Sequence, residues 1–99
     1  MFGLEKRHID YILDTLKQII PNGEFYIFGS RAKGTNKEYS DIDIAVKLGN
    51  EKISADVLGK LLITFTDSTL PYEVDIVDLN AIDEKFKTLI KNDLVELKN

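Results

Sequence analysis

The sequence predicts an α+β protein in layers, with a small mixed β-sheet and helices packed mainly on one face of it. Two observations support this fold class. Short apolar runs of strand length alternate with longer stretches in which apolar residues recur at helical spacing. The order of these stretches is helix, strand, short helix, strand, helix, strand, helix and a final short run. We expect the second and third strands to be antiparallel to, or mixed with, the first.

The first half of the chain contains one long helix and one strand before its glycine-rich part. Apolar residues recur at helical spacing between residues 4 and 20, and Pro21, Asn22 and Gly23 end the helix there. His8 lies in the polar opening turns, where a solvated surface histidine is expected. The apolar run from Phe25 to Phe28 is typical of a buried strand.

The second half contributes a further strand, two helices and two more candidate strands. The run from Ile44 to Val46 is apolar, and residues 55–67 have leucines and a phenylalanine at helical spacing. Residues 72–77 alternate between apolar and acidic side chains, which indicates a strand. A last helix is predicted over residues 81–91, and residues 94–97 are a candidate edge strand.

Length and composition limit the possible classes of protein. The 99 residues, of which 43% are hydrophobic and 30% charged, suit a single domain over residues 1–99 and argue against disorder. The net charge of −4 disfavours direct binding to nucleic acid, which needs a cationic surface. There is no signal-like leader and no apolar run of membrane-spanning length, so we expect a cytoplasmic protein without a membrane partner.

A glycine-serine pair follows the first strand. Ser30 is expected to cap a short helix through Arg31 and Ala32, and a capped helix N-terminus beside a glycine is suited to binding an anion. Gly29 would allow a phosphate group to approach closely, and the hydroxyl of Ser30 could donate to it. Arg31 is a candidate phosphate or partner contact, with solvated surface charge as the alternative.

Two aspartates precede the second strand's apolar run. Side chains alternate between faces, so Asp41 and Asp43 share one face, about 7 Å apart at a rise of roughly 3.3 Å per residue. If the strand over residues 72–77 lies beside them, Asp75 completes a group of three carboxylates. Such a group repels itself but suits a hard divalent cation, and the absence of cysteine leaves oxygen ligands for any metal. The alternative is that these aspartates only keep a strand edge soluble.

These elements resemble the nucleotidyltransferase superfamily that includes DNA polymerase β and the kanamycin nucleotidyltransferases. The motif of that superfamily appears here as Gly29-Ser30, ten residues, then Asp41-Ile42-Asp43, with a later carboxylate in Val74-Asp75-Ile76-Val77. The spacing and the chain length are most similar to the minimal nucleotidyltransferase (MNT) antitoxins, which are paired with HEPN-domain toxins.

The resemblance implies an enzyme that transfers AMP from ATP to a hydroxyl group, with Asp41, Asp43 and Asp75 as catalytic and metal-binding residues. Two Mg²⁺ ions are expected, and Gly29, Ser30 and Arg31 would bind the nucleotide. It further implies a HEPN toxin as partner, whose tyrosine hydroxyl receives AMP and whose RNase activity is thereby silenced. So short a chain leaves the acceptor side to another protein or to a second copy in a homodimer. The alternative is a non-catalytic antitoxin that neutralises its partner by stoichiometric binding.

Overall fold

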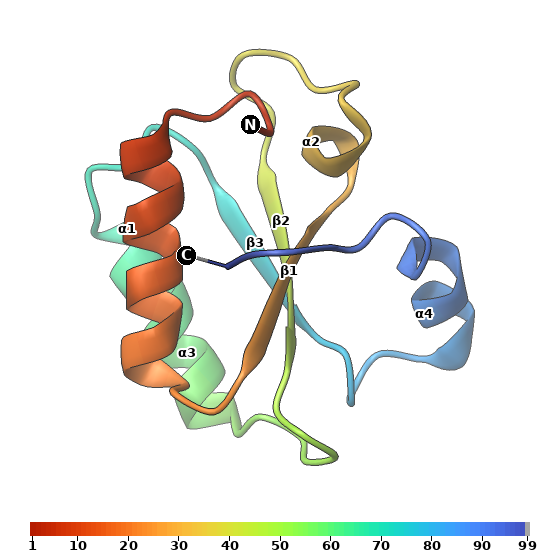
Figure 1. Ribbon diagram of the computed structural model, residues 1–99. Coiled ribbons are helices and arrows are strands. Elements are labelled where there is room, and N and C mark those ends of the chain that lie inside the picture. The colour runs from red at the N-terminus through yellow and green to blue at the C-terminus, as the bar shows by residue number, and fades with distance from the viewer. Residues whose placement is uncertain (99) are drawn as a thin grey trace.

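A four-stranded sheet lies between helices in the computed structural model, which describes residues 1–98 (Figure 1). The elements follow the predicted order: α1 (Lys6–Ile19), β1 (Glu24–Phe28), α2 (Ser30–Lys33), β2 (Ile42–Lys47), α3 (Ala55–Thr66), β3 (Val74–Asp78), α4 (Glu84–Ile90) and β4 (Val95–Glu96). Within residues 1–98, no helix has the length and apolar character needed to cross a bilayer.

The ends of some elements differ from the prediction. The last helix begins three residues later than predicted, at Glu84, because the Asp83 side chain caps it and accepts a hydrogen bond from the backbone N–H of Phe86 at 2.8 Å. The third strand begins at Val74 rather than at residue 72 and extends to Asp78. The first helix spans residues 6–19 instead of 4–20.

The strand order across the sheet is β3-β2-β1-β4. β1 pairs antiparallel with both β2 and β4, whereas β2 and β3 are parallel. A parallel pair needs a crossover connection, and α3 supplies it between β2 and β3. The mixed sheet and the edge strand near the C-terminus are therefore confirmed, and β3 forms the other edge of the sheet.

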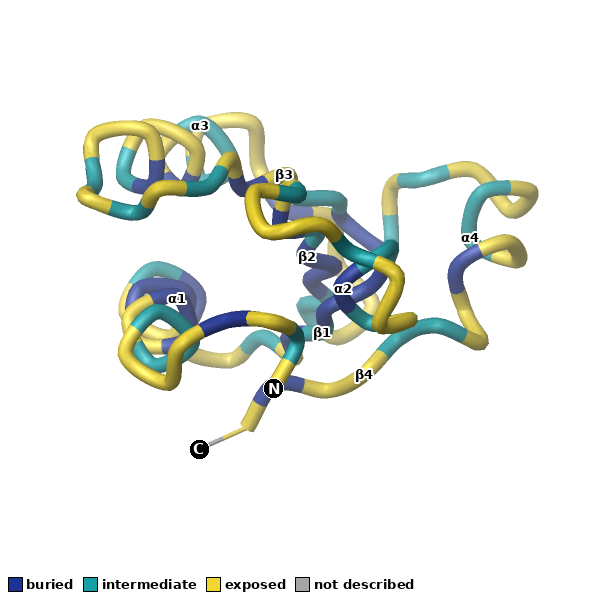
Figure 2. The backbone as a smooth tube through the Cα atoms, turned by 90° about the horizontal axis from the view of Figure 1, so that it is seen from above, coloured by how far each residue is buried: buried dark blue, intermediate teal, exposed yellow. Residues whose placement is uncertain are grey.

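The main hydrophobic core lies on the sheet face covered by α1 and α3 (Figure 2). Ile42, Ile44 and Val46 of β2 are fully buried on this face. They alternate with residues of the opposite face, as a strand requires. In α1, buried Ile12, Leu13 and Leu16 recur at helical spacing and pack into the same core.

The prediction of helices mainly on one face implied that the other face of the sheet is open. In the structure, that other face is partly covered. In Figure 1, α4 lies on the right of the sheet, opposite α1 and α3. Phe28, Ala45, Leu79 and Ile90 form a second, smaller apolar cluster there, because α4 has an apolar side of its own to bury. This face therefore carries both a small core and the polar side chains described next.

Candidate active site

Two carboxylates face each other across the parallel strands. Asp43 of β2 is in register with Asp75 of β3, so both side chains project from the same face of the sheet. Asp41 precedes β2 and is exposed, as is Asp75, whereas Asp43 is half-buried. The structure thus brings the carboxylates of two neighbouring strands together beside the smaller apolar cluster.

Gly29 lies directly against Asp43. A Cβ atom on Gly29 would stand 2.3 Å from Oδ2 of Asp43, a distance that a non-bonded contact does not allow. The φ and ψ angles of Gly29, 74° and −154°, lie in a region that is populated almost only by glycine. Both observations require glycine at this position. The first also shows that the chain at the end of β1 is in close contact with Asp43, a candidate catalytic carboxylate.

Ser30 is the first residue of α2 and not its cap, which corrects the prediction. Gly29 is the N-cap residue, its carbonyl accepts a hydrogen bond from the N–H of Lys33 at 3.1 Å, and no side chain caps the helix. The reason is that the unusual φ of Gly29 already turns the chain into the helix. The first N–H groups of α2 have no partner within the helix, as at any helix start.

Burial and two neighbouring carboxylates disfavour the ionised form of Asp43. Burial raises the pKa of Asp43, and the negative charges of Asp75 and Asp41 raise this pKa further. Asp41 and Asp75 therefore lie within electrostatic reach of Asp43. Such an arrangement costs free energy at neutral pH unless a cation neutralises it.

The donor chemistry of this group fits a hard divalent cation, since all its potential ligands are carboxylate oxygens. No three acidic or histidine side chains among residues 1–98 already surround one point closely enough to hold an ion. Closing such a site would require side-chain rotation, and the exposure of Asp41 and Asp75 leaves them free to rotate.

The side chain of Arg31 is buried and does not lie where the predicted contact with a phosphate group would need it. Its side chain is only 1% exposed, and its guanidinium group donates to the backbone carbonyls of Phe2, Gly3, Glu38 and Ser40 at 2.9 to 3.2 Å. These bonds use all three guanidinium nitrogens, so the structure does not support a nucleotide contact for Arg31. It also excludes the alternative of a solvated surface charge.

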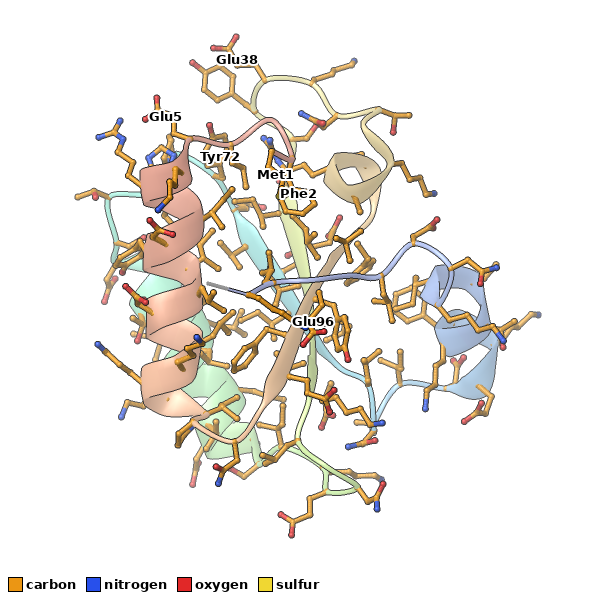
Figure 3. The ribbon with its side chains drawn as sticks, in the orientation of Figure 1. Met1, Phe2, Glu5, Glu38, Tyr72 and Glu96 are labelled. Atoms are coloured by element: carbon orange, nitrogen blue, oxygen red, sulfur yellow. The ribbon has the colours of Figure 1, made fainter. Side chains whose placement is uncertain are left out.

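Arg31 instead joins the segments around the carboxylates. It connects α2 with the N-terminal residues and with the chain just before Asp41, and its guanidinium carbon lies 4.7 Å from the centre of the Tyr72 ring. Figure 3 labels Phe2 and Tyr72 at this end of the molecule. Arg31 is therefore an internal support for the site rather than a ligand of the substrate.

Tyr72 is the residue at this site that the sequence did not single out. Besides Arg31, it meets His8 edge-on, with ring centroids 5.7 Å apart, and Tyr39 at 6.5 Å. His8 is accordingly half-buried, which corrects its expected place as a solvated surface residue. A single tyrosine at the predicted start of a strand gives no signal of such contacts, because they join residues far apart in the sequence.

The sequence and the fold of this chain are similar to those of known proteins. The family model described as "Nucleotidyltransferase domain" matches residues 9–98. A Haemophilus influenzae protein named "Probable protein adenylyltransferase MntA" is 31% identical over 88 residues, which cover 89% of this chain and 76% of the relative.

Two solved structures have the same fold. One is a toxin–antitoxin with AMP-PNP, at 28% identity and a TM-score of 0.74, covering 92% of this chain and 73% of the other. The second is a tri-AMPylated Shewanella oneidensis HEPN toxin in complex with MNT antitoxin, at 26% identity and a TM-score of 0.74, covering 97% and 73%.

Replacing Asp43 should stabilise the metal-free protein. Folding raises the pKa of Asp43, so the native state holds this proton more tightly than the unfolded state, and ionisation costs stability as the pH rises. Asp43→Asn should therefore increase the free energy of unfolding at pH 7 in the presence of a chelator. The gain should shrink as the pH falls through the raised pKa of Asp43 and should vanish below the ordinary pKa of an aspartate, where the carboxyl is protonated in both states.

Denaturant titration at several pH values measures this effect. Asp14→Asn, at an exposed position on α1, is the control and should change stability by less than about 0.5 kcal/mol. A loss of stability in Asp43→Asn at pH 7 would contradict the electrostatic account.

Replacing Gly29 should strain the site and displace Asp43. Gly29→Ala should cost about 1–3 kcal/mol from the backbone conformation, with the contact to the carboxylate in addition. The control is Gly34→Ala, because Gly34 also has a positive φ of 76°, but a Cβ added there would meet no atom of residues 1–98 within 4 Å apart from its own local backbone. Only Gly29→Ala should abolish nucleotidyl transfer. Equal activity of the two variants would argue against close approach at Gly29.

Replacing Arg31 should destabilise the fold. Arg31→Met leaves four backbone carbonyls without their donor, and a hydrogen bond to a charged group contributes about 1.5–3 kcal/mol. We expect a loss of at least about 3 kcal/mol in urea unfolding. Arg7→Met, which removes an exposed pair with Glu5, should cost less than about 1 kcal/mol.

Proposed function

This chain belongs to the nucleotidyltransferase domain family, and on that premise we propose that it is an antitoxin that transfers AMP from ATP to a hydroxyl group of a HEPN-domain toxin. The observation that carries the proposal is the pairing of Asp43 with Asp75, with Gly29 in contact with Asp43. The relative named as a protein adenylyltransferase and the solved complex with an AMPylated HEPN toxin support the choice of substrate and partner.

The reaction is one phosphoryl-group substitution. The oxygen of the acceptor hydroxyl attacks the α-phosphorus of ATP, the bond from that phosphorus to the bridging oxygen of the β-phosphate breaks, and pyrophosphate leaves. The proton of the hydroxyl passes to a base. Positioning and electrostatic stabilisation provide most of the acceleration in such transfers, so few protein groups are needed.

The carboxylates have two tasks in this scheme. Asp41, Asp43 and Asp75 would hold the metal, and Asp75, which is exposed on the edge strand, would also accept the proton of the acceptor hydroxyl. Two Mg²⁺ ions, when bound there, would supply positive charge for the leaving pyrophosphate and lower the pKa of the hydroxyl. The fit rests on the all-oxygen donor set and on the raised pKa of Asp43.

The glycine-serine corner would position the triphosphate. Gly29 keeps the space beside Asp43 free of side-chain atoms, so a phosphate group can approach the carboxylates. Ser30, half-buried at the start of α2, would donate its hydroxyl and its N–H to phosphate oxygens. This corner lies at the end of β1, on the side of Asp43 away from β3.

Incubating the chain with ATP, Mg²⁺ and its HEPN-domain partner tests the proposal. We expect the partner to gain mass in units of AMP in intact-protein mass spectrometry. Asp43→Asn and Asp75→Asn should each lower the rate at least about 100-fold, since a metal site contributes several kcal/mol to transition-state stabilisation. The control Asp14→Asn should keep the rate of the parent protein.

Neutralisation of the toxin without any gain in mass would refute the enzymatic proposal. That outcome would favour the stoichiometric antitoxin, in which the chain acts only by covering its partner. An unchanged rate in Asp43→Asn would refute the assignment of the carboxylates.

A further inference from the structure

A groove lies beside the candidate active site, between α3 and the start of β3. Its volume is about 430 Å³, and its lining includes Leu62, Phe65, Leu70, Tyr72, Glu73 and Asp75. Leu62 is 44% exposed, and the adjacent Ile63 is 64% exposed, although both are large apolar side chains. One of the proposed catalytic residues, Asp75, thus lines a partly apolar depression.

The groove lies on the acceptor side of the site. Across the sheet, Gly29 follows β1, Asp43 lies on β2 and Asp75 lies on the edge strand β3, with the groove beyond it. Attacking and leaving oxygens lie on opposite sides of the phosphorus in such a transfer. If the β- and γ-phosphates lie toward Gly29, the attacking hydroxyl must approach from the side of Asp75, where the groove opens.

The charges along the groove favour a cationic occupant. Two carboxylate side chains line the groove, those of Glu73 and Asp75, and both are exposed. A third acidic residue, Asp67, directly follows Thr66 of the groove lining. Among residues 1–98, no lysine or arginine lines the groove. A triphosphate would be repelled there, whereas a polypeptide segment with basic residues would be attracted.

The edge strand offers the groove's occupant backbone hydrogen bonds. The N–H of Ile42 donates to the carbonyl of Glu73, and the N–H of Leu79 donates to the carbonyl of Val46. Glu73 and Leu79, which flank β3, therefore turn these backbone groups toward β2. By the alternation of a strand, Val74 and Ile76 turn their backbone polar groups outward, away from β2. An extended peptide can pair with such an edge.

We infer that this groove is the acceptor site, which takes an extended, basic segment of the partner protein along β3 and brings its hydroxyl to Asp75. The inference rests on the proposed function and adds the surface that selects the acceptor. The hydroxyl oxygen forms the new bond to the α-phosphorus, pyrophosphate leaves toward Gly29, and the proton passes to Asp75. The apolar part of the groove holds side chains that flank the reacting residue.

The test compares two exposed leucines. Leu62→Arg places bulk and positive charge in the groove, and Leu89→Arg makes the same change on α4, where Leu89 is 72% exposed and lies outside the groove. For each variant, the KM for the HEPN-domain partner and the Kd for AMP-PNP with Mg²⁺ are measured. Thermal melting checks that both variants fold, and Thr66→Arg is a second groove variant at an exposed position.

We expect Leu62→Arg and Thr66→Arg to raise the KM for the partner at least tenfold and to leave the Kd for AMP-PNP within twofold. Leu89→Arg should change neither value. An unchanged KM in both groove variants would overturn the inference. A tenfold weaker binding of AMP-PNP would also overturn the inference, because the groove would then hold the nucleotide. Loss of a homodimer in the groove variants alone would overturn it as well.

Failure of the proposed function gives a different result. In that case the unmodified chain binds its partner and transfers no AMP, whatever the residues of the groove. The acceptor-site inference would fall with it, since it concerns delivery of a reacting hydroxyl. If the unmodified chain does transfer AMP, the KM and Kd values of the groove variants decide whether the acceptor-site inference holds.

Discussion

The parallel pairing of β2 with β3 is the constraint on which the site depends. This pairing sets Asp43 opposite Asp75, and the α3 crossover makes the parallel arrangement possible. A shift of one residue in this register would turn one of the two carboxylates to the hydrophobic core. The burial of Ile42, Ile44 and Val46 on the other face opposes such a shift, so the same apolar side chains stabilise the fold and orient the carboxylates.

The surroundings of the carboxylates contain both destabilising and stabilising features. Burial and the negative charges of Asp75 and Asp41 raise the pKa of Asp43, and Gly29 has a backbone conformation that other residues avoid. The buried side chain of Arg31 stabilises this region, because its hydrogen bonds join the N-terminal residues, α2 and the segment before Asp41. A buried arginine with backbone carbonyls as partners adds rigidity without placing a positive charge among the groups that would bind Mg²⁺.

The two sides of the carboxylate pair differ in chemistry. The side toward β1 has a glycine, a serine and the start of a helix, whereas the side beyond β3 has a partly apolar groove with acidic residues. A transfer reaction needs this asymmetry, because a polyanionic donor and a protein acceptor must approach the same phosphorus from opposite directions.

Periodicity and motif spacing were sufficient to predict the order of elements, the mixed sheet and the shared sheet face of Asp43 and Asp75, because strand alternation is a local property of the chain. The metal site of Asp41, Asp43 and Asp75 stays a prediction, since no three such side chains among residues 1–98 already surround one point. The sequence did not reveal the burial of Arg31, the contacts of Tyr72, the cover that α4 gives to the second sheet face, or the groove beside Asp75. Each of these depends on contacts between residues that are distant in the sequence, as in the hydrogen bonds from Arg31 to Phe2 and Gly3. Local residue patterns carry no information about such contacts, which form only when the packed helices and strands bring those segments together.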